Sequence, residues 1–413
     1  MRILFLGLNY APEEIGIARY STGMCEELAR RGHQIEAIVG KPYYPDWEVP
    51  EEYRGGGARQ SVENGVKITR VPHYVPSDPG GAKRIIHHAT FGLSALLPMI
   101  RAARSHKPDL VMTIAPSTIG AASARIAARM AGAKSWLHIQ DFEVGAALAT
   151  GLVSEGGMVS RLAKAFEKWV VTGFDHVSSI SFEMCRKIGT YGVPEDRVSE
   201  FRNWVEGGEV YPLDEPSAYR QEWNIQTPHV ALYSGNIANK QGIDILVDVA
   251  RKLEDRTDLT FVICGNGPNR AMLEQQAAGL GNIQFHNLQP MERLNELMNL
   301  ATVHLLPQKA DAADLVLPSK LTNMLASGRP VAATADRDTG LGREVDGCGL
   351  LVPPGDPDAL ATALERLIDD EALYTSSALA AVQRADERWN KDNIFGALDA
   401  QLRSVASTGP SLA

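Results

Sequence analysis

The sequence has few cysteines and no excess of positive charge. Its 413 residues include four cysteines, which lie far apart and form no CxxC pair. This distribution argues against a disulfide framework and is typical of a reducing compartment. Lys and Arg number 41 against 50 Asp and Glu, which gives a net charge of −9. Because nucleic-acid binding needs a broadly cationic surface, we expect no nucleic-acid partner.

Long apolar runs are also missing. A membrane-spanning helix needs about 20 consecutive apolar residues, and no segment approaches that length. The N-terminal MRILFLGLNYAPEE reaches a polar turn after a short apolar run, so we interpret it as a first strand rather than a signal peptide. We therefore expect a cytoplasmic protein.

One apolar segment, ATFGLSALLPMI (Ala89–Ile100), has basic residues on both sides. It is either a buried helix with solvated ends or a helix that rests on an anionic bilayer. The second interpretation predicts a peripheral protein at the inner face of the cell membrane. The flanking residues are Lys83, Arg84, His87, His88, Arg101, Arg104 and Lys107.

Short apolar runs alternate with helical patterns along most of the chain, which is typical of βαβ units and a mainly parallel sheet. The length exceeds one ordinary core, so we expect two domains. We predict an N-terminal Rossmann-like domain over residues 1–204, a linker over 205–228 and a C-terminal Rossmann-like domain over 229–385. A helix that is free to pack back on the first domain, followed by a frayed tail, should occupy residues 386–413.

Twelve apolar runs are the expected strands. In the first half they are Arg2–Leu8, Gln34–Gly40, Val66–Val71, Asp109–Ala115, Ser135–Gln140 and His176–Ser181; in the second half they are His229–Gly235, Leu259–Gly265, Asn282–Asn287, Thr302–Pro307, Pro330–Ala335 and Gly349–Pro354.

Glycines follow several of these strands, where ligands of such sheets bind. Gly16 precedes a helix and either lets backbone approach a ligand or simply permits a tight turn. Gly235 opens the loop SGNIANKQG. Gly265 and Gly267 supply two of three dinucleotide-binding glycines, but Asn269–Arg270 stands where the third would fall, so this fingerprint is weak.

The segment HIQDFE supplies His138, Asp141 and Glu143 at another strand end. A His with two nearby acids can bind a metal, but general-base or acceptor-orienting work suits this position better. The Asp336–Asp338 pair also follows an apolar run, and we interpret it as a polar loop rather than a metal site.

The stretch VLPSKLTNMLASGRPVA has helix signals at both ends. Pro318 suits the first turn of a helix and Gly328 suits a helix end. It is either a well-capped crossover helix, or a helix whose Ser319, Lys320 and free N–H groups face a phosphate-bearing ligand.

Four motifs, GNIANKQG, ICGNGPNR, LLPQKA and PSKLTNMLASGRPVAAT, occur in order, one per strand end. This order resembles the retaining glycosyltransferase family 4, and the likeness covers nearly the whole chain. Together with NYAPEEIGIARY, GKPYYPDW and HIQDFE, it is most similar to the WcaI-type branch of colanic acid biosynthesis, which acts on lipid-linked exopolysaccharide precursors. The resemblance implies an α/β protein of the GT-B fold, with two Rossmann-like doubly wound domains facing a central cleft.

By this resemblance, Lys240 contacts the donor diphosphate, Gly16 lets the acceptor-domain loop approach it, and His138 lies near the transferred sugar. A lone Lys240 would otherwise be interpreted as a solvated side chain. The family's paired glutamates, eight positions apart, would fall at Leu315 and Asn323, and both carboxylates are absent. The amide of Asn323 can still hold the ribose, whereas Leu315 cannot contact donor-sugar hydroxyls.

The family's phosphate-binding arginine is replaced by Asn236. Ser319, Lys320 and the helix N-terminus after Leu317 are placed to supply the missing positive potential. The expected donor-binding set is Gly16, Gly235, Asn236, Lys240, Gly265, Gly267, Pro268, Asn287, Leu317, Ser319, Lys320, Leu321 and Asn323. The expected catalytic residues are His138, Asp141 and Lys240, with Glu143 on the acceptor side.

We therefore expect a glycosyltransferase that moves a sugar, fucose or another hexose, from a nucleotide diphosphate sugar to a polyprenyl diphosphate-linked saccharide. We expect retention of configuration and no metal or other cofactor. One alternative is a nucleotide-sugar epimerase or hydrolase of the same fold, which would show turnover without acceptor. Another is a non-catalytic protein that binds nucleotide but consumes no donor.

Overall fold

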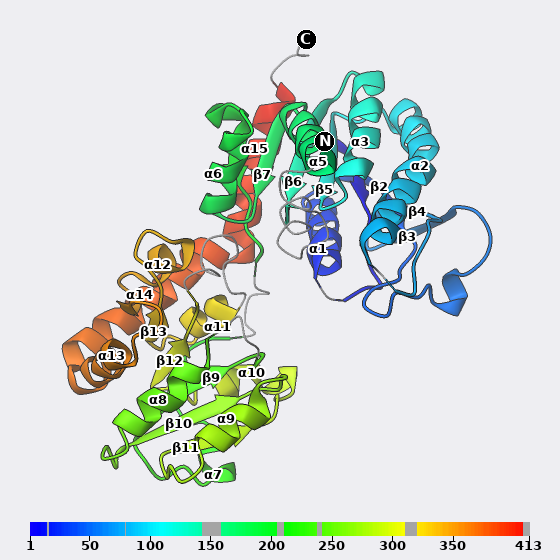
Figure 1. Cartoon of the computed structure of the whole chain (residues 1–413). Coiled ribbons are helices and arrows are strands. Elements are labelled where there is room, and N and C mark those ends of the chain that lie inside the picture. The colour runs from blue at the N-terminus through cyan, green and yellow to red at the C-terminus, as the bar shows by residue number, and fades with distance from the viewer. Residues whose placement is uncertain are drawn as a thin grey trace. The chain divides into compact units, whose positions relative to one another are not determined.

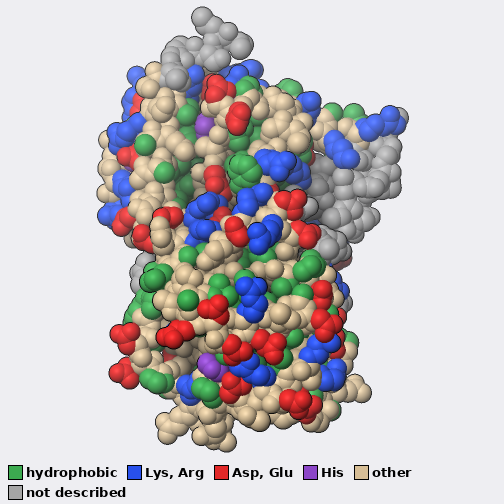
Figure 2. Space-filling model, turned by 90° about the vertical axis from the view of Figure 1, so that its left-hand side faces the viewer, with side chains coloured by type: hydrophobic (Ala, Val, Ile, Leu, Met, Phe, Trp, Pro, Cys, Tyr) green, Lys and Arg blue, Asp and Glu red, His purple; other side chains and the backbone are tan. Residues whose placement is uncertain are grey.

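The chain forms two compact units. The computed structural model describes residues 1–14, 16–78, 80–142, 158–204, 210–237, 242–309 and 320–407. The first unit comprises Met1–Asn203 and the C-terminal residues from Phe395 onward, and the second comprises Trp204–Ile394. Each unit is an α/β layer structure (Figure 1). On the surface drawn in Figure 2, acidic and basic side chains are interspersed in both units.

The first unit is built on an eight-stranded sheet in the order β3-β4-β2-β1-β5-β6-β7-β8. Its strands pair in parallel except β3, which is antiparallel to β4. The central strands are buried along almost their whole length, as expected when helices cover both faces. The strands are β1 (Arg2–Gly7), β2 (Gln34–Gly40), β3 (Arg59–Glu63), β4 (Val66–Val71), β5 (Leu110–Ala115), β6 (Lys134–Ile139), β7 (His176–Ser179) and β8 (Val198–Glu200).

The helices of the first unit lie on two faces of this sheet. Right-handed crossovers place α1 on one face, because the chain there moves from β1 toward β2. They place α2, α3, α5 and α6 on the other face, because the chain then moves from β4 through β5, β6 and β7 to β8. The core agrees, since Leu4 and Leu6 pack with Phe91 of α2 and Ala124 of α3. The helices are α1 (Ile17–Arg30), α2 (Gly81–His106), α3 (Thr118–Ala131), α5 (Met158–Thr172) and α6 (Phe182–Thr190).

The last helix, α15 (Lys391–Ser407), brings the end of the chain into the first unit. Its Phe395 is fully buried and lies edge-on to Phe201, with ring centroids 5.9 Å apart. His33 contacts Asp399 at 2.7 Å from Nε2 to Oδ1. Apolar packing and this polar contact therefore hold the C-terminal residues against the first sheet.

The second unit has a six-stranded parallel sheet in the order β11-β10-β9-β12-β13-β14. The strands are β9 (His229–Ser234), β10 (Leu259–Cys264), β11 (Ile283–His286), β12 (Val303–Leu306), β13 (Val331–Thr334) and β14 (Gly349–Val352). The helices are α7 (Tyr219–Glu222), α8 (Asp244–Lys252), α9 (Arg270–Gln276), α10 (Leu294–Met298), α11 (Lys320–Ala326), α12 (Gly340–Val345), α13 (Pro357–Asp369) and α14 (Glu371–Trp389). Short 3₁₀ helices in the chain are η1 (Glu51–Tyr53), η2 (Glu195–Arg197) and η4 (Met291–Arg293).

The segment Ala89–Ile100 lies within α2 and divides between two environments. Phe91, Ala95 and Met99 are buried against the sheet, whereas Leu93 and Leu97 are exposed. The buried-helix interpretation is therefore right for one face of this segment only. Among the described residues, no helix has the length and apolarity to cross a membrane.

Candidate functional site

Two glycine-containing loops of the second unit pack backbone to backbone just after β9 and β10. Gly235 N donates to Cys264 O and Ile237 N donates to Asn266 O, both at 2.9 Å. A Cβ on Gly265 would lie 1.9 Å from the carbonyl oxygen of Gly235, and one on Gly267 would lie 2.2 Å from that of Ile237. These two glycines therefore permit the close approach of two loops at the carboxyl edge of the sheet.

Lys320 begins α11 and extends its side chain over this edge. Its ammonium lies 4.0 Å from the centre of the Tyr233 ring. The same Nζ would lie 3.5 Å from a Cβ on Gly235, which is ordinary contact distance, so the ammonium also lies close to this glycine. Within the described part of the chain, no acidic side chain pairs with Lys320. Burial lowers the pKa of this ammonium to about 7, because a charge removed from water without a counter-ion is disfavoured.

Asn323 follows Lys320 by one helical turn, a spacing that places both on one side of α11. Its Oδ1 is buried and accepts no hydrogen bond from the residues that the structure describes. Leu321, by contrast, is fully buried and belongs to the core beside Leu306. The predicted set on α11 thus divides into two polar groups with unused bonding capacity and one core residue.

The other predicted donor-side residues lie in the same loops. Asn287 follows β11, and its Oδ1 accepts from Arg270 Nη1 at 2.8 Å. Arg270 also donates to the carbonyl oxygens of Gly265 and His286. Asn236 and Pro268 are exposed, and the Asn236 carbonyl accepts from the Tyr233 hydroxyl at 2.7 Å. Arg270, which we did not single out as a site residue, is the group that ties the loops after β10 and β11 together.

His138 occupies the interior of the first unit. It lies on β6, is fully buried and contacts the Phe201 ring at 4.9 Å. Its Nδ1 is 2.9 Å from Ser178 Oγ, and its Nε2 is 3.1 Å from the amide nitrogen of Gln140. Burial lowers the pKa of the imidazole to about 3, so the ring is neutral at pH 7 and both nitrogens have partners.

Gln140 separates His138 from the loop after β6. Its amide exchanges two hydrogen bonds with Asn203, at 2.8 Å and 3.1 Å. Because the amide nitrogen of Gln140 donates to Nε2, the proton of His138 resides on Nδ1. Gln140 was not among the predicted residues, although it stands in the same HIQDFE motif. An effect of His138 on an acceptor stays a prediction. Because His138 is enclosed and contacts Gln140, such an effect would act through Gln140. Asp141 is exposed beside it and accepts from Phe142 N at 2.8 Å.

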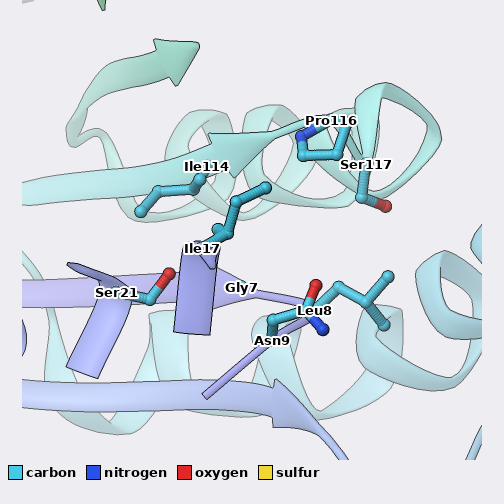
Figure 3. A pocket seen from close by; sticks show the side chains of 8 residues that line it. All are labelled: Gly7, Leu8, Asn9, Ile17, Ser21, Ile114, Pro116 and Ser117. Carbon is cyan, nitrogen blue, oxygen red and sulfur yellow. The ribbon is translucent and has the colours of Figure 1, made fainter. Parts of the chain in front are cut away.

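A small pocket lies at the carboxyl ends of β1 and β5, where the strand order of the first sheet reverses (Figure 3). Such switch points are where doubly wound sheets bind ligands. Gly16 precedes α1 with a φ of +62°, and no side chain caps the helix. The Ser21 and Ser117 hydroxyls are buried and have no hydrogen-bond partner among the residues that the structure describes. The pocket is lined by Gly7, Leu8, Asn9, Ile17, Ser21, Ile114, Pro116 and Ser117.

Several predicted residues lie outside the described residues, namely Glu143, Lys240, Leu315, Leu317, Pro318 and Ser319. Within the described ranges, no three His, Cys, Asp or Glu side chains gather as metal ligands. Asp336 belongs to the turn before α12, where its carbonyl accepts from the Thr339 hydroxyl at 2.6 Å.

Comparison with known proteins agrees with this architecture. Residues 16–204 match the family described as glycosyl transferase 4-like domain, and residues 228–370 match glycosyl transferases group 1. The chain is 37% identical over 405 residues to the putative colanic acid biosynthesis glycosyl transferase WcaI of Escherichia coli strain K12, which covers 96% of this chain and 98% of that protein.

Solved structures share the fold at low sequence identity. Sucrose-phosphate synthase from Thermosynechococcus elongatus superimposes with a TM-score of 0.67 at 18% identity, covering 98% of this chain and 99% of that one. Anabaena Alr3699/HepE, solved in complex with UDP, superimposes with a TM-score of 0.69 at 15% identity, covering 98% and 100%.

Proposed function

Because the chain belongs to the glycosyltransferases that combine a 4-like domain with a group 1 domain in the GT-B fold, we propose that it transfers a hexose, such as fucose, from a nucleotide diphosphate sugar. The proposed acceptor is a polyprenyl diphosphate-linked saccharide of exopolysaccharide biosynthesis. The name of the relative that shares 37% identity, a putative colanic acid enzyme, supports the pathway. The UDP complex of Alr3699/HepE supports a nucleotide-sugar donor.

The observation that carries the proposal is the ammonium of Lys320, which has no acidic partner among the described residues. A cation that is partly removed from water without an acidic partner is costly unless an anion arrives. The donor diphosphate is such an anion, and its negative charge grows as the glycosidic bond to it breaks. A fixed ammonium held over Tyr233 would therefore stabilise the transition state more than the ground state.

Asn323 extends this site toward the nucleoside. Its Oδ1, which has no hydrogen-bond partner in the described part of the chain, would accept a hydrogen bond from a ribose hydroxyl, a task for which the family's glutamate is missing. Lys240 is proposed to contact the same diphosphate. Charge neutralisation by lysines is the reason we propose a metal-independent reaction, and retention is proposed from the likeness to family 4.

The acceptor side is assigned to the first unit. Within the described ranges, the pocket at the switch point offers two hydroxyls without a hydrogen-bond partner and a helix start without a side-chain cap, which suit a polar acceptor group. A lipid-linked acceptor would also require the protein to work at the inner face of the cell membrane, as a peripheral protein.

Nucleoside diphosphate release tests the proposal directly. A panel of nucleotide sugars is incubated with the protein, with and without a polyprenyl diphosphate-linked saccharide, and in the presence or absence of EDTA. We expect release that depends on the acceptor and is insensitive to EDTA. Equal release without acceptor would instead identify a hydrolase or epimerase, and tight binding without release would identify a non-catalytic protein.

A further inference from the structure

Three of the helices that cover one face of the first sheet, α2, α3 and α5, have an unusual charge balance. α2 carries four Lys and Arg residues, α3 carries two and α5 carries three, whereas the single acid in these helices is Glu167. Glu167 is buried and accepts from the Tyr191 hydroxyl at 2.7 Å, so its carboxylate does not face solvent. A chain with a net charge of −9 thus concentrates positive charge on these three helices.

The same helices expose large apolar side chains. Leu93 is 73% exposed on α2, Leu162 is 65% exposed on α5, and Trp169 is 55% exposed on α5. Single exposed leucines need no explanation, but a group of them marks an interaction site. The exposed apolar residues of the three helices are Ile85, Ile86, Leu93, Leu97, Ile126, Met130, Leu162, Phe166 and Trp169.

Their spacing aligns them along the outer side of each helix. Ile86, Leu93 and Leu97 are separated by seven and four positions, and Leu162, Phe166 and Trp169 by four and three. These intervals repeat on one side of an α-helix. Ile126 and Met130 on α3 follow the same rule. The inner side of each helix is occupied by buried residues, so the exposed rows face away from the sheet.

Direct contacts join the three helices into one layer. The Ser123 hydroxyl of α3 donates to Gly92 O of α2 at 2.9 Å. The Arg125 guanidinium of α3 lies 4.6 Å from the Trp169 ring centre of α5 and donates to its carbonyl at 3.2 Å. Figure 1 shows α2, α3 and α5 on the same side of the first sheet. We call their outer side the basic apolar face.

We propose that the basic apolar face docks on an anionic lipid surface, with its leucines and Trp169 among the head groups and its Lys and Arg residues on lipid phosphates. Helices that lie in a membrane interface combine these two residue classes, and Trp is favoured at that depth. The inference rests on the proposed function, because a lipid-linked acceptor presents its sugar at such a surface.

The charge pattern disfavours other occupants. In a symmetric dimer the face would meet its own copy, and two layers without an exposed acid would repel each other. Nucleic acid offers phosphates but nothing that buries a row of exposed leucines. An anionic bilayer supplies both phosphates and an apolar layer beneath them.

Cosedimentation with vesicles tests the docking. Vesicles of phosphatidylcholine alone are compared with an equimolar mixture of phosphatidylcholine and phosphatidylglycerol. We expect binding to the anionic vesicles only, weakened by added salt. Reversing Lys83, Arg101 and Arg104 to Glu should weaken binding at least about tenfold. Arg84 is left unchanged because its guanidinium stacks on Trp47.

An apolar variant and matched controls complete the design. Leu93→Ser with Leu97→Ser should weaken binding about tenfold, since two leucine side chains that would enter the lipid are replaced by polar ones. Leu379→Ser, which changes a 69% exposed leucine of α14, and Arg337→Glu should leave binding unchanged. Circular dichroism melting checks that each variant folds. Unchanged binding in both the charge and apolar variants, or equal binding to neutral vesicles, would overturn the proposal.

Trp169 provides an independent readout. Its fluorescence should shift to the blue on vesicle addition and be quenched by brominated lipids, and Trp169→Phe should remove that signal. A dimer in lipid-free solution that the Leu93 and Leu97 changes dissociate would also overturn the proposal. Vesicle binding needs no turnover, so a chain that binds vesicles without transferring sugar refutes only the proposed function.

Discussion

Lys320 is a half-buried and His138 a fully buried ionisable group, and they differ in what surrounds them. His138 has a partner on each ring nitrogen, from Ser178 and Gln140. Lys320 has an aromatic ring beneath it and, within the described residues, no acid to neutralise it. A buried group whose bonds are all satisfied holds the fold together. One whose charge is unsatisfied tends to lose its proton and keeps the charge when an anion binds, so the second unit carries the clearer signature of a binding site.

The largest expected effect concerns acid pH and two of the fully buried histidines, His138 in the first unit and His304 in the second. Burial lowers the pKa of both His138 and His304 to about 3, against about 6.5 in an unfolded chain. The unfolded chain therefore binds protons first as pH falls, so stability is complete above pH 6.5 and is lost below it. Between pH 6.5 and pH 5, the two histidines together should lower the unfolding free energy by about 4 kcal/mol, because each contributes about 1.4 kcal/mol per pH unit.

Urea denaturation at a series of pH values checks this. The slope of unfolding free energy against pH should be shallower in His138→Gln than in the parent. A parent chain whose stability did not fall between pH 6.5 and pH 5 would contradict the assignment of neutral buried rings.

The second prediction separates structure from binding at His138. His138→Ala removes a packed ring and leaves Gln140 and Ser178 without their partner, which should cost about 2–4 kcal/mol in unfolding free energy. Nucleoside diphosphate affinity should stay nearly unchanged, because the donor loops belong to the other unit. Transfer should slow in both His138→Ala and Asp141→Asn if they act on the acceptor. A large loss of nucleotide affinity in either variant would place it at the donor site instead.

The third prediction concerns catalysis by Lys320. Each charge-assisted contact to phosphate contributes about 1.5–3 kcal/mol, so Lys320→Ala should slow transfer by one to two orders of magnitude, at about 1.4 kcal/mol per tenfold. Part of the loss should persist at saturating donor. Lys252, an exposed lysine paired with Asp358, is the matched control, and its alanine variant should change the rate by no more than about twofold.

If Lys240 contacts the same diphosphate, the Lys240→Ala and Lys320→Ala double variant should be non-additive. A transfer rate of Lys320→Ala within about twofold of the parent rate would instead support the interpretation of PSKLTN as the start of an ordinary capped helix.

Much of the fold follows from the sequence because buried parallel strands are apolar along their length. All twelve expected strands occur in the two sheets. β3 and β8 were missed, since RQSVE is largely exposed and VSE spans only three residues, so neither leaves an apolar run. An apolar sequence pattern arises where side chains are buried, and a short or exposed edge strand has few buried side chains.

The site was less predictable, because its properties depend on contacts between distant residues. The PSK motif pointed to Lys320, but only the fold shows that Tyr233 and Gly235 lie beneath its side chain. His138 stood in a suggestive motif, yet β6 is covered on both faces and the ring is enclosed. The glycines of GNGPNR suggested ligand approach, whereas Gly265 and Gly267 permit two loops to touch.

Proton uptake on nucleotide binding tests the central claim most directly, that Lys320 awaits an anion. Calorimetric titration of nucleoside diphosphate at pH 8, in two buffers of different ionisation enthalpy, measures the protons taken up. With the pKa of free Lys320 about 7, diphosphate binding should take up close to one proton. Affinity should then rise by up to about tenfold per unit as pH falls from 9 toward 7, whereas Lys320→Met should take up none. Equal proton uptake by the parent and Lys320→Met would contradict the account.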